Sequence, residues 1–360
     1  MAVQKVLVLC IDGLEPKIIN RLLSQNKLPN FKKLKYYSSL RTTIPPQSPT
    51  AWASFITGLS AQEHQLVDFV KRKPKNYGLY LAHSPRDKNL PFQGKPFWEK
   101  KKDIKTKVLF LPDTFPAPQN TKTQIISGLG TPDILGTEGS FTLFSQKKSE
   151  VELNRGQKII LSQSKKINTF LPGPDFQILT GTKKSNLPLL LEINKNNLKI
   201  KLSNQKIILK EKEFSPWIRL SFQKGFKRVW AIAKFYLVSL KPLKLYLSPL
   251  QIDPLKPLYL ISSPFSFSKN LASKYGSFAT LGLPHDAWAY DQNIFSQKAF
   301  LSQVNDLFLE REKIILGELK DFSADLFVAY LGTIDTIQHM FWGNREIINH
   351  YYQKIDELLG

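Results

Sequence analysis

Short runs of apolar residues alternate with helix-like patterns in the first third of the chain and again near its end. The runs at 5–11, 107–112 and 326–330 are almost wholly apolar, which is typical of strands buried in a parallel sheet. The segment 292–322 has apolar residues at helical spacing, which predicts a long amphipathic helix. Strands that alternate with helices predict an α/β fold with a mostly parallel sheet and helices on both faces.

The pattern changes at about residue 113. From 140 to 247, short apolar runs are separated by Gly, Asn, Lys and Pro, which predicts antiparallel β-structure. We therefore expect a core formed by residues 1–112 and 265–360, with residues 113–264 inserted as a β-rich cap. The length of 360 residues also exceeds the usual size of one hydrophobic core.

Smaller elements follow from the same reasoning. Helices are expected at 15–24, 267–275 and 343–359, and a further helix is expected to begin near Gly94. The segment 38–44 is predicted to be a strand that leads into the helix after it.

Ser48 stands where this strand is expected to give way to a helix. Pro49 is favourable in a first helical turn, apolar residues recur at helical spacing from Ala51, and Gly58 is well placed to end the helix. A helix N-terminus favours phosphate, and a hydroxyl held there is a candidate nucleophile once something, such as a metal ion, lowers its pKa. A serine that only caps the helix is the common structural alternative.

Two further stretches carry candidate metal ligands. Asp12 ends the apolar run 5–11, and ligand sites in open α/β sheets lie at the carboxyl ends of strands. Asp335 and His339 follow the run 326–330, and their i, i+4 spacing on a helix would place both on one face as a workable pair of zinc ligands. The structural alternatives are an ordinary Asp-Gly turn at Asp12 and a surface pair at 335 and 339.

Together these three stretches resemble the alkaline phosphatase superfamily, and most closely its type I phosphodiesterase/nucleotide pyrophosphatase branch. In that family the first strand ends in a metal-binding Asp, which Asp12 matches. The nucleophile lies nine residues before a Thr-Gly pair, and counting back from Thr57 gives Ser48. The Asp-x-x-x-His pair of the family matches Asp335 and His339. The segment 58–69 is also similar, although Gln65 replaces the usual Gly after His64.

The resemblance implies a metal-dependent hydrolase of phosphoric esters that acts on a phosphorylated small molecule or a nucleotide. It implies two divalent metal ions, zinc or alternatively manganese, with Asp12 and the Ser48 oxygen at one and Asp335 and His339 at the other. Ser48 would attack phosphorus. The turn-rich segment 127–139 resembles part of the same branch, so Thr131 and Asp133 are candidates to face the substrate. A purely structural loop is the alternative for this segment.

The family also uses an Asp-His pair and a further His that lie later in its chain, and we find no match for them after His339. We therefore expect this sequence to correspond to the N-terminal part of a longer enzyme, with the remaining ligands supplied by further chain or by a partner chain. Two alternatives stay open: a non-catalytic binding or remnant protein on the same fold, and a basic nucleic-acid-binding protein.

The net charge of +22 is compatible with nucleic acid or with phosphorylated small molecules. The lysines are scattered and no known nucleic-acid-binding motif is present, so nucleic acid is the less favoured partner. Cys10 is the single cysteine, which excludes an intrachain disulfide and suits a cytoplasmic location. No apolar stretch approaches about 18 residues, so no membrane span is expected.

Overall fold

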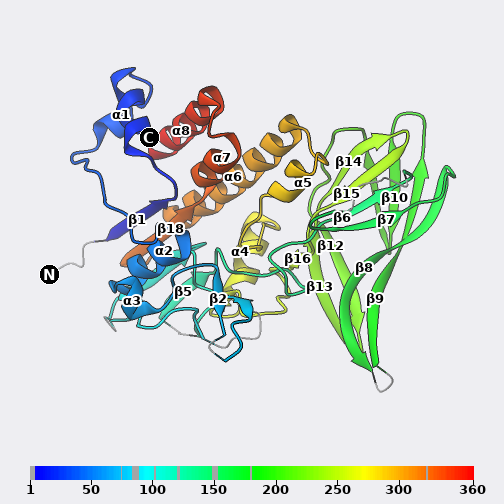
Figure 1. The fold of residues 1–360 in the computed structure, drawn as a ribbon, viewed down its shortest axis with the longest axis horizontal. Helices are drawn as coiled ribbons and strands as arrows, with labels where there is room; N and C mark the ends of the chain where they lie inside the picture. The colour runs from blue at the N-terminus through cyan, green and yellow to red at the C-terminus, as the bar shows by residue number, and fades with distance from the viewer. Residues whose placement is uncertain are drawn as a thin grey trace. The chain divides into compact units, whose positions relative to one another are not determined.

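The computed structural model describes residues 5–73, 75–82, 89–100, 103–119, 122–147, 153–178, 181–321 and 323–360. Contacts between Cα atoms divide the chain into two compact units (Figure 1). Unit 1 comprises residues 1–129, 262–267 and 304–360, and unit 2 comprises residues 130–261 and 268–303. The predicted core–cap division at residues 113 and 264 stays a prediction of domain organisation.

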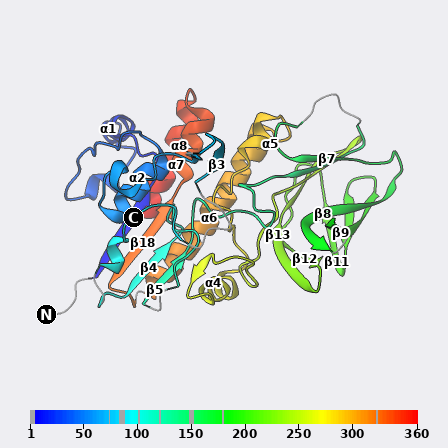
Figure 2. The same cartoon turned by 60° about the horizontal axis from the view of Figure 1, so that its bottom comes forward.

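Unit 1 is built on a five-stranded, mostly parallel sheet (Figures 1 and 2). Its strand order is β1 (Val6–Ile11), β18 (Leu326–Leu331), β4 (Thr106–Leu109), β5 (Thr123–Ile126) and β17 (Ser262–Ser263). The first four strands are parallel, and β17 pairs antiparallel with β5. The three strands expected from the apolar runs are therefore confirmed, as is the mixed α/β class.

Helix α2 (Ser48–Thr57) packs on this sheet through its apolar face. Ala53 and Ile56 belong to one buried cluster with Cys10, Val108 and Val328 of three neighbouring strands. The long helix α6 (Gln297–Lys320) is tied to β4 by a buried ion pair between Lys107 Nζ and Glu318 Oε2, 2.5 Å apart. These contacts fix α2 and α6 against the sheet.

The other helices of unit 1 are short or lie near the C-terminus. Asp356 of α8 is buried and accepts hydrogen bonds from the backbone N–H groups of Asn30 and Phe31, which fixes the loop after α1. The remaining elements are α1 (Pro16–Ser24), the 3-10 helix η1 (Phe31–Lys33), α3 (Ala61–His64), the pair β2 (Val70–Arg72) and β3 (Leu79–Leu81), η2 (Phe97–Glu99), α7 (Thr333–Phe341) and α8 (Arg345–Leu359).

Three sequence-based expectations in unit 1 differ from the structure. Residues 38–44 form no strand, and Leu40 is 93% exposed, because β-propensity expresses fit to a sheet surface and no described strand lies alongside this segment. The helix expected from Gly94 is only the 3-10 turn η2. The strand expected at 107–112 also ends early, at Leu109, because Phe110 has a positive φ of 62°.

Unit 2 is dominated by antiparallel β-structure, as expected for the inserted segment. Its sheets have the orders β11-β10-β9-β8, β12-β13-β16 and β14-β15-β6-β7. Only the β6–β7 pair among these is parallel. The strands are β6 (Thr142–Ser145), β7 (Gln157–Ile160), β8 (Lys166–Ile178), β9 (Gly181–Ile193), β10 (Leu198–Leu202), β11 (Gln205–Leu209), β12 (Ile218–Lys224), β13 (Lys227–Ala233), β14 (Phe235–Leu240), β15 (Leu243–Leu247) and β16 (Gln251–Ile252).

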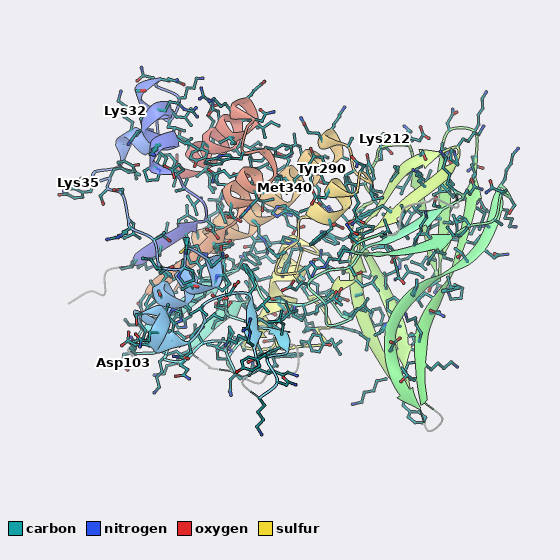
Figure 3. The ribbon with its side chains drawn as sticks, viewed as in Figure 1. Lys32, Lys35, Asp103, Lys212, Tyr290 and Met340 are labelled. Carbon is teal, nitrogen blue, oxygen red and sulfur yellow. The ribbon has the colours of Figure 1, made fainter. Side chains whose placement is uncertain are left out.

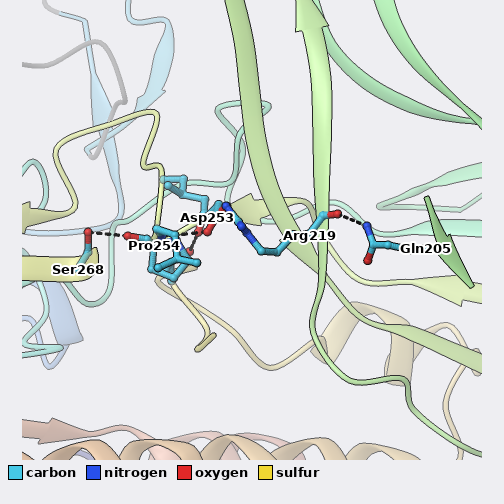
Figure 4. Close-up of polar contacts among 8 residues, drawn as sticks. Gln205, Arg219, Asp253, Pro254 and Ser268 are labelled. Atoms are coloured by element: carbon cyan, nitrogen blue, oxygen red, sulfur yellow. Dashed lines mark hydrogen bonds and ion pairs between the residues drawn. The ribbon is translucent and has the colours of Figure 1, made fainter. Parts of the chain in front are cut away.

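Polar and aromatic contacts link the parts of unit 2. Arg219 donates two hydrogen bonds to buried Asp253 Oδ2, at 2.6 and 2.8 Å, and its carbonyl accepts one from Gln205 (Figure 4). In the first turn of helix α4 (Phe267–Tyr275), Ser268 Oγ donates a hydrogen bond to Pro254 O at 3.0 Å (Figure 4). The short helix α5 (Ala287–Asp291) carries Tyr290 (Figure 3), and the Tyr290 ring stacks on Phe300. Of the helices in the described ranges, none combines the length and the apolar character that a bilayer crossing needs.

Candidate functional site

The candidate site lies in unit 1, at the carboxyl edge of the parallel sheet. Asp12 directly follows β1, and its backbone N–H donates to Leu331 O at 3.0 Å, which extends the pairing of β1 with β18 by one step. Asp335 lies in the first turn of α7, just after β18. Because neighbouring parallel strands end at the same edge, both carboxylates reach one region.

Gly13 brings the two carboxylates together. A Cβ atom at Gly13 would lie 2.8 Å from Asp335 Cα and 2.9 Å from its backbone nitrogen, so the loop after β1 passes directly over the start of α7. Gly13 has a φ of 76°, which glycine adopts without strain. Its carbonyl also accepts a hydrogen bond from Gln338 Nε2. The close approach therefore requires a residue without a side chain after Asp12.

Two aromatic residues orient the Asp12 carboxylate. Asp12 Oδ2 accepts one hydrogen bond from Trp52 Nε1 at 3.0 Å and one from Tyr330 Oη at 2.9 Å. The two rings meet edge to face with centroids 5.2 Å apart. Burial, followed by the charge of Asp12, raises the pKa of Tyr330 well above its usual value, so its phenol stays a proton donor.

Asp335 and His339 form the second part of the site. Both lie on α7, and His339 Nε2 is 3.3 Å from Asp335 Oδ1, so the expected i, i+4 contact is present. Burial, and after it the charge of the nearby Asp12, raise the pKa of Asp335 to about 6, against the opposing effect of His339. The His339 side chain is 76% exposed and so is accessible to a ligand.

Ser48 is the first residue of α2, and the helix ends at Gly58 in the left-handed conformation, as expected. Gln47 occupies the N-cap position without a capping hydrogen bond from its side chain, so Ser48 is not the capping residue considered as the structural alternative. Trp52 lies one helical turn after Ser48 and hydrogen-bonds Asp12. The first turn of α2, which carries Ser48, is therefore anchored at the same edge of the sheet as Asp12.

Thr131 and Asp133 lie in unit 2 and are buried. Asp133 Oδ1 accepts hydrogen bonds from the backbone of Leu135 and Thr137, and its Oδ2 accepts one from the Thr137 hydroxyl at 2.7 Å. Burial raises the pKa of Asp133. These contacts hold the local loop together, which supports the structural alternative, and the substrate-facing role stays a prediction.

Trp52, Tyr330 and Gly13 were not expected as site residues. Their contacts with Asp12 and Asp335 join residues 40 to more than 300 positions apart in the chain, which no local pattern shows. The one available signal was the position of Trp52 a single turn after Ser48. His64, in contrast, has a structural role, because its ring nitrogens contact Ser54 Oγ and the backbone N–H of Leu66.

The donor types of the site suit a divalent metal, but the set is small. Two neighbouring carboxylates and an imidazole are the oxygen and nitrogen ligands that zinc and manganese take. Within the described ranges, however, no group of three or more His, Cys, Asp or Glu side chains gathers closely enough to hold an ion. The residues therefore have suitable donor atoms for a metal, but they are too few to complete a four-coordinate site.

Comparison with known proteins agrees with the geometry. Residues 6–168 match the family described as Type I phosphodiesterase / nucleotide pyrophosphatase, which confirms the resemblance seen in the sequence. The matched stretch contains Asp12 and Ser48 and ends before Asp335 and His339. No protein of curated function and no solved structure matches the chain.

Proposed function

Since residues 6–168 match the type I phosphodiesterase/nucleotide pyrophosphatase family, we propose that the protein is a metal-dependent hydrolase of phosphoric esters with Ser48 as its nucleophile. One observation carries the proposal. The helix that begins at Ser48 is hydrogen-bonded through Trp52 to Asp12, and the residue after Asp12 touches Asp335. These contacts support a site in which three segments far apart in sequence contribute a hydroxyl, two carboxylates and an imidazole at one sheet edge.

In this proposal the Ser48 oxygen forms a bond to phosphorus as the bond to the leaving oxygen breaks, the hydroxyl proton passes to solvent and the leaving oxygen takes a proton from water. A water molecule then cleaves the phosphoserine, which releases the phosphoryl product and restores the Ser48 hydroxyl. The first-turn N–H groups of α2 lack partners within the helix and point toward its N-terminus, where they favour the negative charge of the phosphoryl oxygens. The packing of Ala53 and Ile56 on the sheet holds this turn in place. Trp52 and Tyr330 fix the orientation of Asp12.

Asp12, Asp335 and His339, together with the Ser48 oxygen, are the residues that would hold metal. The family is usually metal-dependent, and we propose two divalent ions, zinc or alternatively manganese. Such an ion lowers the pKa of a bound hydroxyl and offsets charge on phosphoryl oxygens. Ligands beyond these would come from a partner chain, which stays a prediction.

The proposed substrate is a phosphorylated small molecule or a nucleotide, with a monoester, diester or pyrophosphate bond. The net charge of +22 favours encounter with such anions. A cytoplasmic location, expected from the single cysteine, stays a prediction as well.

The test is hydrolysis of bis-p-nitrophenyl phosphate by the purified chain with zinc or manganese added. Ser48→Ala and Asp12→Asn are expected to lower kcat/KM by about 10³-fold or more, because each removes a group that acts in the reaction. Ser54→Ala is the matched control, since it removes a hydroxyl from the same helix that contacts His64 instead. Full activity in Ser48→Ala would contradict the assignment of the nucleophile.

A second candidate function is favoured by the small number of ligands. Because no group of three or more acidic, His or Cys side chains gathers in the described ranges, the fold could bind a phosphorylated ligand without hydrolysing it. Absence of turnover together with saturable, metal-dependent binding of a non-hydrolysable phosphonate would identify this case. Binding of random oligonucleotides that weakens steeply with salt would instead support the nucleic-acid alternative.

A further inference from the structure

A cavity of about 350 Å³ lies within unit 2, and its lining includes none of the residues assigned above. It is lined by Gln146 after β6, residues 163–165 before β8, residues 193–195 at the end of β9, and residues 240–241 at the end of β14. Three of the lining residues are lysines, and the lining includes neither an acidic nor an aromatic residue. We propose that this cavity binds a small polyvalent oxyanion of the pyrophosphate class.

The floor of the cavity is held by a network around Gln146. Its Nε2 donates to the carbonyls of Ser162 and Ser164, at 2.9 and 3.2 Å, and its Oε1 accepts from Leu243 N at 2.9 Å. Gln163 Nε2 returns a hydrogen bond of 2.6 Å to the Gln146 carbonyl. Because these amides are already satisfied, the cavity is formed before a ligand arrives, which lowers the entropic cost of binding.

The three lysines supply the recognition. The Lys165 carbonyl accepts a hydrogen bond from Ile193 N at 2.8 Å, which joins the segment before β8 to the end of β9. Lys195 and Lys241 lie in the turns that follow β9 and β14. In the described part of the chain no carboxylate pairs with any of these three ammonium groups, whereas Lys199 and Lys201 nearby in sequence both pair with Glu192, at 3.1 and 3.2 Å.

The charge and shape of the cavity select the class of ligand. The lining contains three lysines and no acidic residue, so it carries a net positive charge that attracts an anion with several charges more strongly than a monoanion. Lysine binds phosphate as a point charge and needs no planar partner. Single-stranded nucleic acids are usually held by aromatic side chains that stack on the bases, and none lines this cavity. The volume also lies near the lower end for ligand sites.

The inference does not depend on the proposed hydrolase function, and its test keeps the two apart. Titration calorimetry of the full chain with sodium pyrophosphate is made at 150 mM NaCl and in EDTA, so that no metal-dependent binding at Asp12 or Asp335 contributes. The wild type is expected to bind one pyrophosphate per chain, more tightly than sulfate. The triple variant Lys165→Gln/Lys195→Gln/Lys241→Gln is expected to bind at least about tenfold more weakly.

The matched control is Lys206→Gln/Lys210→Gln/Lys227→Gln, which removes three exposed charges from unit 2 outside the cavity. It is expected to change the affinity by less than about twofold, because exposed charges far from a ligand are screened by salt. All six lysines are exposed, so both variants should keep the circular dichroism spectrum of the wild type.

An equal loss in both triple variants would overturn the inference, because it would show attraction to the general positive charge of unit 2. Absence of saturable pyrophosphate binding by the wild type would overturn it too. Tight binding of a fluorescent oligonucleotide that only the cavity variant loses, without pyrophosphate binding, would assign the lysines to nucleic acid and reject the small-anion site.

Discussion

At the scale of single residues, the site is defined by what holds Asp12. Both aromatic donors contact the same oxygen, Oδ2, so removal of either leaves the other in place. Trp52 differs from Tyr330 because it lies on the helix that begins at Ser48, so its hydrogen bond also connects that helix to Asp12. A change at Trp52 therefore tests the alignment of two segments at once.

Trp52→Phe is expected to keep the aromatic contacts with Tyr330 and to remove the indole N–H. We expect kcat/KM to fall by about 10- to 100-fold, as for other groups that orient a metal ligand, and the free energy of unfolding to fall by about 1 kcal/mol. Trp98→Phe is the control, since the buried Trp98 Nε1 has no hydrogen-bond partner in the described structure. Equal losses of activity in both variants would mean that the Asp12 contact has no special role.

The carboxyl of Asp335 gives a prediction on pH that needs no substrate. Its pKa in the folded protein is raised to about 6, above the value near 4 of an exposed carboxyl, first by burial and then by Asp12. A raised carboxyl pKa means that folding favours the protonated form. The stabilisation is therefore complete below about pH 4 and is lost as pH rises through about 6.

Denaturation of the chelator-treated protein from pH 4.5 to pH 7 measures this contribution. Asp335→Asn is expected to remove about 1–3 kcal/mol of the decrease in unfolding free energy over that range. Asp12→Asn is expected to lower the pKa of Asp335, followed by carboxyl NMR, because it removes the neighbouring negative charge. An unchanged pKa in Asp12→Asn would show that the two carboxylates are too far apart to interact.

At the scale of elements, the buried ion pair between β4 and α6 has the largest predicted effect on stability. Lys107→Met would remove the buried cation that pairs with Glu318, and we expect the free energy of unfolding to fall by about 3–5 kcal/mol. The double variant Lys107→Met/Glu318→Met should recover most of that loss, because two apolar side chains can replace a buried pair. Urea unfolding curves of the three proteins form the test, and a single variant as stable as the wild type would contradict it.

Periodicity predicted the elements that carry their own pattern. The strands β1 and β18 and the helix that begins at Ser48 were expected, because a buried strand or an amphipathic helix shows its period in a single segment, whereas the helix of Asp335 and His339 was considered only as a condition for their pairing. The prediction of a strand at 38–44 was wrong, because a strand forms only where a neighbouring strand pairs with it, and no described strand pairs with this segment. The C-terminal end of β4 was predicted three residues too late, because Phe110 has a positive φ and a residue other than glycine gives no sign of this in the sequence.

The same limit explains the candidate site. Asp12, Ser48, Asp335 and His339 could be named from sequence, because each follows a predicted strand or begins a predicted helix, and their roles stay predictions. The hydrogen bonds of Trp52 and Tyr330 to Asp12 could not be named, since they depend on how α2 packs against β18. The contact of Gly13 with Asp335 depends likewise on the neighbouring positions of β1 and β18.

At the scale of the whole molecule, the high positive charge opposes association of copies through an exposed sheet edge. In the described structure β1 is the edge strand and pairs only with β18, and Val6 and Leu7 are about half exposed. An open strand edge with apolar side chains is a template for pairing with another chain. The net charge of +22 opposes such pairing between copies, and this repulsion weakens when salt screens it.

We therefore expect the chain to self-associate more strongly at 500 mM than at 50 mM NaCl, as measured by sedimentation velocity. Leu7→Lys should suppress the association, because it places a charge on the open edge. Leu260→Lys is the control, since it adds the same charge at an exposed leucine outside β1. If both variants suppress association equally, net charge is sufficient to explain the effect. If only Leu7→Lys does so, the β1 edge is the surface through which copies meet, and any partner that completes the sheet must compete for it.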